Sequence, residues 1–152
     1  MDLIKGENNL DCILAAAAMV MDIDLVELKK LIGHDGSEII FPNSPEPYCC
    51  RGFHIQEIID QAFLNGWSVM YIQREFGLEP FIGEDPPFII NVPDKRMATY
   101  LKKFPGIIAG ANNNKNHAVA WNGKMIYDPS GRIYSLREFN YNIQEFWAFS
   151  SI

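Results

Sequence analysis

The sequence predicts an α+β fold in which a helical N-terminal half packs against an antiparallel β-sheet. Helix-like segments lead the chain up to residue 64, and strand-like segments dominate after it. An Asn-Gly pair at positions 122 and 123 separates two strand-like runs, which is the strongest short-range signal for a β-hairpin. A helical half and a sheet of this kind usually pack as layers around one core.

The first helix is predicted over residues 13–21, because this stretch holds strong helix formers and no glycine, proline or charge. It is apolar on every face, so it should be buried all round rather than amphipathic. Asp11 is a good N-cap candidate, which would place Cys12 in the first helical turn.

The remaining elements follow from apolar periodicity and from glycine stop signals. Gly33 and Gly66 are expected to end the second and third helices. The expected helices cover residues 24–32, 55–64 and 94–102, and the expected strands, apart from the hairpin, cover 68–73, 88–92, 107–109 and 145–149.

The predicted hairpin brings a histidine and an aspartate together. With a two-residue turn at Asn122 and Gly123, counting outward pairs residue 121 with 124 and His117 with Asp128. Directly opposed residues have Cβ atoms about 4.5 to 5.5 Å apart, so the carboxylate could accept a hydrogen bond from the imidazole. The alternative is a surface ion pair without a chemical role.

Cys12 has the surroundings of a reactive thiol. At a helix N-terminus, unpaired N–H groups and the helix dipole favour an anion, and thiol pKa values there fall when a cation is also near. An aspartate that orients a histidine leaves the second ring nitrogen free to exchange a proton with a thiol. The alternative is that Cys12 is a small buried residue that begins a core helix.

The sequence resembles the papain-like peptidases of the C39 type. The resemblance covers nearly the whole chain and is carried by Asp11-Cys12 before the apolar helix, by residues 117–120 (HAVA) and by residues 127–131 (YDPSG). The family has an acidic residue before the cysteine, a histidine that begins a strand, and an Asp-Pro sequence. The resemblance implies a papain-like fold over residues 1–152 as a single peptidase domain. It also implies that Cys12 is the nucleophile, His117 the general base and acid, and Asp128 the orienting residue.

The sequence departs from the family at two positions near the cysteine. Gly6 stands where the family usually has a glutamine that binds the oxyanion, and Ile13 replaces a common glycine. Asn8 or Asn9 could supply an amide instead, although either could equally belong to an ordinary polar loop. Loss of one oxyanion donor typically costs about 100- to 1000-fold in rate.

Three functions stay open at this stage. The first is a thiol peptidase that cleaves amide bonds of a peptide or protein substrate through an acyl-enzyme. The second is other thiol acyl chemistry, as in a deamidase or a transglutaminase-like transferase. The third is a degenerate papain-like domain that binds peptide or protein without cleaving it, as the glycine at position 6 and Ile13 would favour.

Composition and charge limit the kinds of partner that the chain is expected to bind. The chain has 152 residues, of which 48% are hydrophobic, and a formal net charge of −6. It lacks a cluster of lysine and arginine, which argues against nucleic acid or an anionic membrane surface as a partner. The residues before the apolar run carry net negative charge, unlike a signal peptide, so we expect a cytoplasmic protein. The oligomeric state is not predicted.

The longest irregular stretch, residues 33–52, could wall a substrate cleft. It contains Cys49 and Cys50, with His34 and His54 nearby. Adjacent cysteines rarely bind one tetrahedral ion and no CxxC spacing is present, so neither a metal nor another cofactor is predicted. The polar residues 112–116 before His117 are expected to be either a rim of the cleft or a simple connector.

Overall fold

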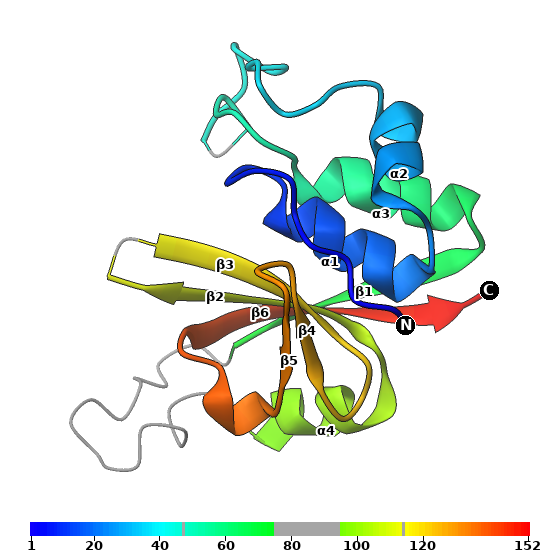
Figure 1. Ribbon diagram of the computed structural model, residues 1–152, viewed down its shortest axis with the longest axis vertical. Coiled ribbons are helices and arrows are strands. Elements are labelled where there is room, and N and C mark those ends of the chain that lie inside the picture. The colour runs from blue at the N-terminus through cyan, green and yellow to red at the C-terminus, as the bar shows by residue number, and fades with distance from the viewer. Residues whose placement is uncertain (47, 75–94, 114) are drawn as a thin grey trace.

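A central sheet carries helices on both faces in the computed structural model, which describes residues 1–46, 48–74, 95–113 and 115–152 (Figure 1). Within those residues the helices are α1 (Cys12–Met21), α2 (Leu25–Ile32), α3 (Ile55–Leu64) and α4 (Lys95–Lys103), with a 3-10 turn at Leu136–Glu138. The strands are β1 (Trp67–Gln73), β2 (Gly106–Asn112), β3 (Lys115–Trp121), β4 (Ile126–Asp128), β5 (Arg132–Tyr134) and β6 (Asn142–Ser151). The α+β class predicted from the sequence is therefore confirmed.

Six strands of the described chain form one sheet in the order β1-β6-β2-β3-β4-β5. Every neighbouring pair is antiparallel. The C-terminal strand β6 lies between β1 and β2, so residues far apart in the sequence share the centre of the sheet. A register shift in the β2–β6 pair falls between Ala109 and Gly110.

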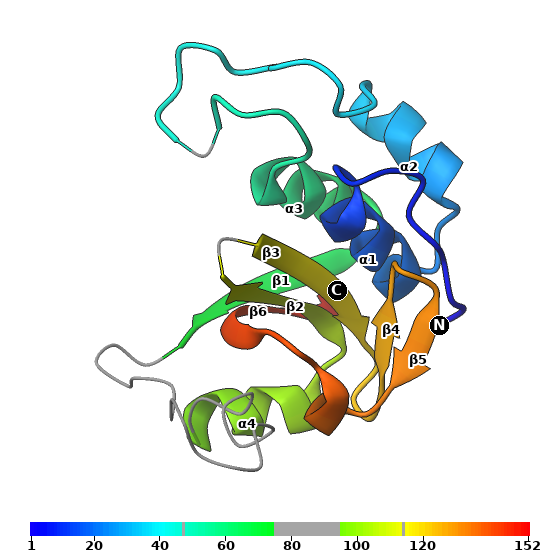
Figure 2. The same ribbon diagram turned by 60° about the vertical axis from the view of Figure 1, so that its left-hand side comes forward.

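Helices α1 and α3 cover one face of the sheet, and α2 packs on these two helices (Figure 2). In α1 every residue from Leu14 to Met21 is buried, as its wholly apolar composition predicts. Its alanines allow the helix to lie close to the sheet, where Ala118 and Ala120 of β3 belong to the same core. Helix α1 packs on β3, and the first residues of both elements line one pocket.

The opposite face of the sheet forms a second core with α4. Alternation along β3 separates the two cores, since Val119 and Trp121 face α4 whereas Ala118 and Ala120 face α1. The Trp121 indole N–H donates to the carbonyl of Leu101 in α4 at 2.7 Å. Among the described residues, no helix has the length and apolar character needed to cross a bilayer.

The predicted elements agree closely with the structure. Helix α3 has the predicted bounds, and α1, α2 and α4 lie within one residue of theirs at each end. Strands β1, β2 and β6 contain the predicted segments and extend beyond them. The strand predicted over residues 88–92 lies outside the described residues. Strand β5 was not predicted.

The predicted hairpin register is wrong by two residues. Trp121 pairs with Ile126 rather than with residue 124, so Asp128 falls opposite Val119 instead of His117. The cause is Asn122, whose side-chain oxygen accepts hydrogen bonds from the backbone N–H groups of Lys124 and Met125, at 2.9 and 2.8 Å. This side-chain turn widens the connection to four residues. A shift of two residues keeps every side chain on its predicted face.

Candidate active site

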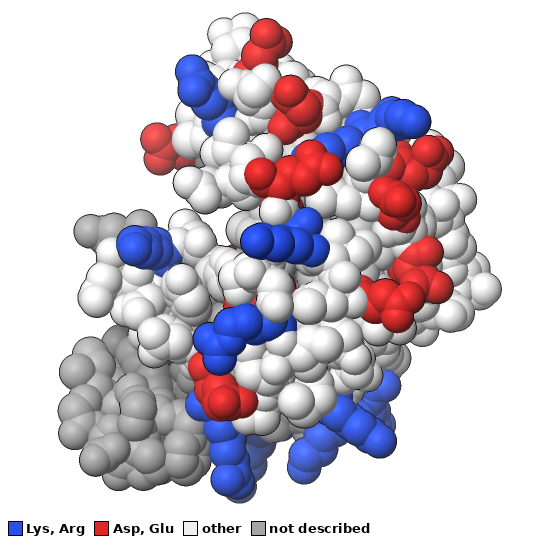
Figure 3. All heavy atoms as spheres, viewed as in Figure 1, with Lys and Arg blue, Asp and Glu red and all other residues white. Residues whose placement is uncertain are grey.

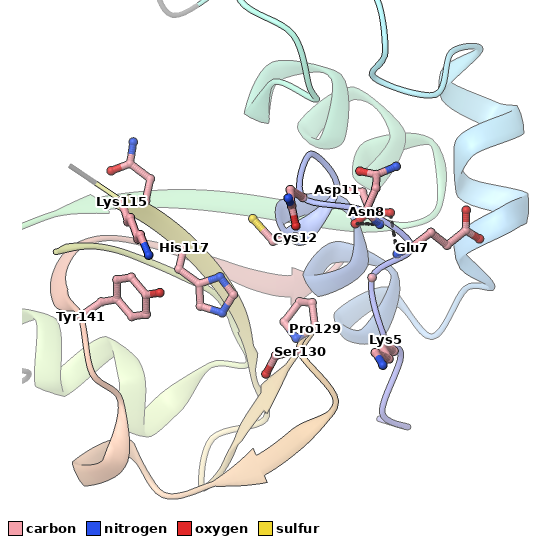
Figure 4. A pocket seen from close by; sticks show the side chains of 13 residues that line it. Lys5, Glu7, Asn8, Asp11, Cys12, Lys115, His117, Pro129, Ser130 and Tyr141 are labelled. Atoms are coloured by element: carbon pink, nitrogen blue, oxygen red, sulfur yellow. Dashed lines mark hydrogen bonds between the residues drawn. The ribbon is translucent and has the colours of Figure 1, made fainter. Parts of the chain in front are cut away.

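Cys12 and His117 line one pocket of about 680 Å³ at the junction of the helical layer and the sheet. Figure 4 shows the Cys12 sulfur pointing from the start of α1 toward the His117 ring on β3. The pocket is lined by Lys5, Gly6, Glu7, Asn8, Asn9, Asp11, Cys12, Lys115, Asn116, His117, Pro129, Ser130 and Tyr141.

The backbone around Cys12 presents hydrogen-bond donors to this pocket. The first hydrogen bond of α1 runs from the Ala15 N–H to the Asp11 carbonyl at 2.8 Å. The N–H groups of Cys12 and Ile13 precede that bond, so they have no acceptor within the helix. Cys12 itself is partly exposed, whereas Leu14 and the residues after it are buried. The thiol therefore stands at the open end of an otherwise buried helix.

Asp11 occupies the predicted N-cap position, but its side chain does not cap the helix. The fully buried carboxylate points back toward the preceding loop and accepts from the Glu7 N–H at 3.0 Å and the Asn8 N–H at 3.5 Å. It also forms an ion pair with Lys29 of α2 at 3.1 Å. Asp11 thus links residues 7–11 and α2 beside Cys12. Its predicted N-cap position is confirmed, although its side chain makes no capping hydrogen bond.

His117 and Asp128 are in direct contact despite the altered register. Nε2 of His117 lies 2.8 Å from Oδ1 of Asp128, and because a carboxylate only accepts, Nε2 is the donor. Diagonal neighbours on one sheet face remain within reach of long side chains. The Nδ1 atom is therefore left for the Cys12 side of the ring, which is the arrangement that a thiol–imidazole pair requires.

Two further groups hold the Asp128 carboxylate. The Ser130 N–H donates to Oδ1 at 2.9 Å, and the Tyr134 hydroxyl donates to Oδ2. Asp128 is buried, with an exposed fraction of 5%. The Tyr141 ring packs on His117 with centroids 5.1 Å apart. These contacts fix both the carboxylate and the plane of the imidazole.

The protonation states of His117, Asp128 and Tyr134 depend on one another. Burial alone would lower the pKa of His117, but the hydrogen bonds and charges of Asp128 and Cys12 raise it to about 9. Burial opposes ionisation of Asp128, yet the hydrogen bonds from His117, Tyr134 and Ser130 hold the pKa of Asp128 well below its usual range. Burial and the Asp128 carboxylate raise the pKa of Tyr134, so it stays a neutral donor. At neutral pH the ring is therefore imidazolium beside a carboxylate.

Sequence reasoning did not identify Tyr134, Ser130 or Tyr141. The signal available for Tyr134 was the turn at Ser130 and Gly131, after which the chain returns beside β4. Tyr134 pairs with Ile126, which lies on the same face as Asp128. A second hairpin predicted at that turn would place the Tyr134 hydroxyl beside the Asp128 carboxylate.

The loop before Cys12 explains the glycine at position 6. The Gly6 N–H donates to the Pro129 carbonyl at 2.8 Å, which ties this loop to the segment after Asp128. A Cβ atom at position 6 would lie 2.7 Å from Oδ1 of Asp11, so a larger residue would have to displace that carboxylate. A glutamine side chain therefore has no place at position 6 in this loop.

Both asparagines considered as replacements line the pocket. The side-chain oxygen of Asn8 accepts from the Leu10 N–H at 2.8 Å and so belongs to a local turn. Within the described residues, no hydrogen bond engages the Asn9 side chain. The amide of Asn9 is thus the freer of the two.

His34 has a structural role in the loop that follows α2. Nδ1 of His34 accepts from the Gly36 N–H at 3.1 Å, and its Nε2 lies 2.6 Å from Oε1 of Glu57. Cys49 and Cys50 are free thiols outside the pocket of Cys12. In the described part of the chain, no three His, Cys, Asp or Glu side chains are grouped as metal ligands would be. Of residues 112–116, Lys115 and Asn116 line the pocket, as expected for a rim.

Charged side chains around the site are mixed in sign. Lys5, Lys115 and Glu7 all line the pocket. Figure 3 shows acidic side chains mostly over the upper, helical part of this face and basic side chains gathered along its lower edge.

Comparison with known proteins shows a likeness to a solved structure. A search of protein-family models and a search of curated proteins both returned no match. Among solved structures, the chain is similar to a double glycine motif protease from an AMS/PCAT transporter, determined in complex with the leader peptide. The TM-score is 0.56 at 18% identity, over 99% of this chain and 91% of that chain. The two chains share a fold. At this identity the likeness concerns the fold alone, so the chemistry of the site rests on the residues described above.

Proposed function

We propose that the chain is a thiol peptidase of the C39-like, papain-like kind, formed by residues 1–152 as one domain, with Cys12, His117 and Asp128 as its triad. One observation carries the proposal: a thiol at a helix start and an imidazole oriented by a buried carboxylate share one pocket. The shared fold with a double glycine motif protease supports it. A binding domain would not need a histidine held as imidazolium beside a thiol.

The proposed reaction begins with attack of the Cys12 thiolate on the carbonyl carbon of a peptide bond. A C–S bond forms, and the carbonyl oxygen becomes an oxyanion that the Cys12 N–H stabilises at the N-terminus of α1. Asn9 is the proposed side-chain donor to the same oxygen. His117 gives a proton from Nδ1 to the leaving amine as the C–N bond breaks. Water, deprotonated by the same nitrogen, then attacks the acyl carbon; the C–S bond breaks, the acyl group leaves as an acid and Cys12 is again a thiolate.

Active-site acylation tests this proposal without knowledge of the natural substrate. We expect p-nitrophenyl acetate to give a burst of one p-nitrophenolate per chain, with the acetyl group mapped to Cys12 by mass spectrometry. His117→Ala should abolish the burst, whereas Cys49→Ala should leave it intact. Acetylation of Cys49 or Cys50 alone would contradict the proposal.

A second candidate function is peptide binding without cleavage, and the crowding at Gly6 favours it. If no side-chain donor reaches the oxyanion, the rate falls by about 100- to 1000-fold. Such a domain would bind peptides but show no burst.

Adding hydroxylamine to the acylation assay also tests for transfer chemistry, because an acceptor amine would then compete with water for the acyl group.

A further inference from the structure

A second pocket lies beside the proposed active site, and we call it the interlayer pocket. It has a volume of about 710 Å³ and lies between the helices and the sheet. Ile13, which follows Cys12, lines it, and Asn116 lines both pockets. The interlayer pocket is lined by Ile13, Tyr48, Ile55, Ile59, Tyr71, Ala109, Gly110, Ala111, Asn116, Gln144, Glu145 and Trp147. A chain bound at Cys12 could therefore extend a side chain into it.

Most of the lining is apolar, and β6 contributes its one charged side chain. Trp147 pairs with Tyr71 across the sheet, and their ring centroids lie 5.7 Å apart. Glu145 is two residues before Trp147 on the same strand face, directly opposite Ala109 of β2. Because position 109 is an alanine, little side chain stands between Glu145 and the space of the pocket. The pocket thus combines an aromatic and aliphatic lining with a single carboxylate.

Glu145 is oriented but not neutralised. The Tyr71 hydroxyl donates to Oε1 of Glu145 at 3.0 Å, which leaves Oε2 for another donor. Over the described residues, no Lys, Arg or His forms an ion pair with Glu145. Positions 47, 75–94 and 114, which the structure does not describe, hold no Lys, Arg or His in the sequence. The carboxylate is therefore available to a cation from outside the chain.

We propose that the interlayer pocket binds a lysine or arginine side chain of the peptide substrate and that Glu145 determines this preference. The aliphatic stem of such a side chain would pack on Trp147 and Ile13. Its charged end would reach Oε2 of Glu145, where a charge-assisted hydrogen bond forms in partly desolvated surroundings. The chain carries a net charge of −6, which also favours a basic peptide. This inference rests on the proposed function, because it assumes that a peptide lies at Cys12.

Capture of a degenerate peptide library by the immobilised Cys12→Ala chain tests the inference. We expect lysine and arginine to be enriched at one position by about fivefold or more, which is modest for a charged contact in a half-open pocket. Glu145→Gln, in the same background, should remove that enrichment and keep the apolar preferences at other positions. A matched control is Glu27→Gln, which removes an exposed carboxylate on α2.

Two results would overturn the inference. One is the absence of any enrichment of basic residues, whether or not peptides are captured. The other is equal enrichment in the Glu145→Gln variant. A retained circular dichroism spectrum and melting temperature would show that Glu145→Gln is folded. The proposed function is judged separately by acetylation of Cys12, which needs no peptide in the interlayer pocket. Acetylation without basic selectivity would therefore reject only the inference.

Discussion

Replacing Asp128 with asparagine should lower the pKa of His117 from about 9 toward the ordinary histidine value of 6.5. Asparagine keeps the size of the side chain but removes the charge that stabilises the imidazolium. Cys12→Ala should lower the same pKa by a smaller amount, because the hydrogen bond with Asp128 is the stronger of the two stabilising contacts.

The same pKa sets a stability change with pH. The folded value of about 9 lies above the unfolded value near 6.5, so the contribution of His117 is complete below pH 6.5 and is lost as the pH rises to 9. The difference between these values corresponds to about 3 kcal/mol. Since 18% of the His117 side chain is exposed, solvent screening reduces this to roughly 1 to 2 kcal/mol.

Imidazole-detected nuclear magnetic resonance measures the pKa, and chemical unfolding at pH 6 and pH 9.5 measures the stability. His117→Gln assigns the resonance among the three histidines of the chain. Wild type should lose roughly 1 to 2 kcal/mol more than Asp128→Asn between the two pH values. A wild-type His117 pKa near 6.5, or equal changes of stability with pH in both proteins, would show that Asp128 does not stabilise the imidazolium.

Three further predictions concern the surroundings of the site. Gly6→Ala should lower the free energy of unfolding by about 1 to 3 kcal/mol, because its Cβ would lie 2.7 Å from the buried Asp11 carboxylate; urea denaturation measures this, and an unchanged midpoint would contradict it. Tyr134→Phe should cost about 1 to 3 kcal/mol, since Asp128 loses a buried donor; thermal unfolding at pH 7 checks it, and a stability equal to wild type would count against the contact. Asn9→Ala should slow the acylation burst by about 100-fold or more if this amide binds the oxyanion. Stopped-flow measurement gives the burst rate, and a rate equal to wild type would exclude that role for Asn9.

Local sequence signals predicted the helices well. Helix α3 begins and ends where its apolar pattern does, and α1 is buried on all sides because no polar residue interrupts it. Strand β2 was predicted too short because Gly106 and Gly110 have low strand propensity. Both glycines are explained by crowding across the sheet, since a Cβ at Gly110 would lie 2.8 Å from the Tyr141 side chain. Contacts of this kind are not visible in a local pattern.

The sequence predicted the contact between His117 and Asp128 but not the hairpin register or the side chains that hold Asp11 and Asp128. The sequence predicted that His117 and Asp128 share a face, and this held because the register error was even. The turn itself depends on which backbone groups the Asn122 side chain accepts, and propensity alone does not specify that choice. The Asp11 carboxylate turned away from the helix because Lys29, eighteen residues later, offers it a charge partner. The role of Tyr134 likewise depends on a tertiary contact.

Labelling each cysteine with iodoacetamide as a function of pH shows whether Cys12 and His117 act as a thiolate–imidazolium pair. Mass spectrometry would follow all three cysteines separately in wild type and in His117→Ala. Wild-type Cys12 should label at pH 7 about tenfold or more faster than Cys49 or Cys50, and His117→Ala should remove this advantage. Equal and slow labelling of Cys12 in both proteins, with Cys49 or Cys50 the faster thiol, would contradict this pairing.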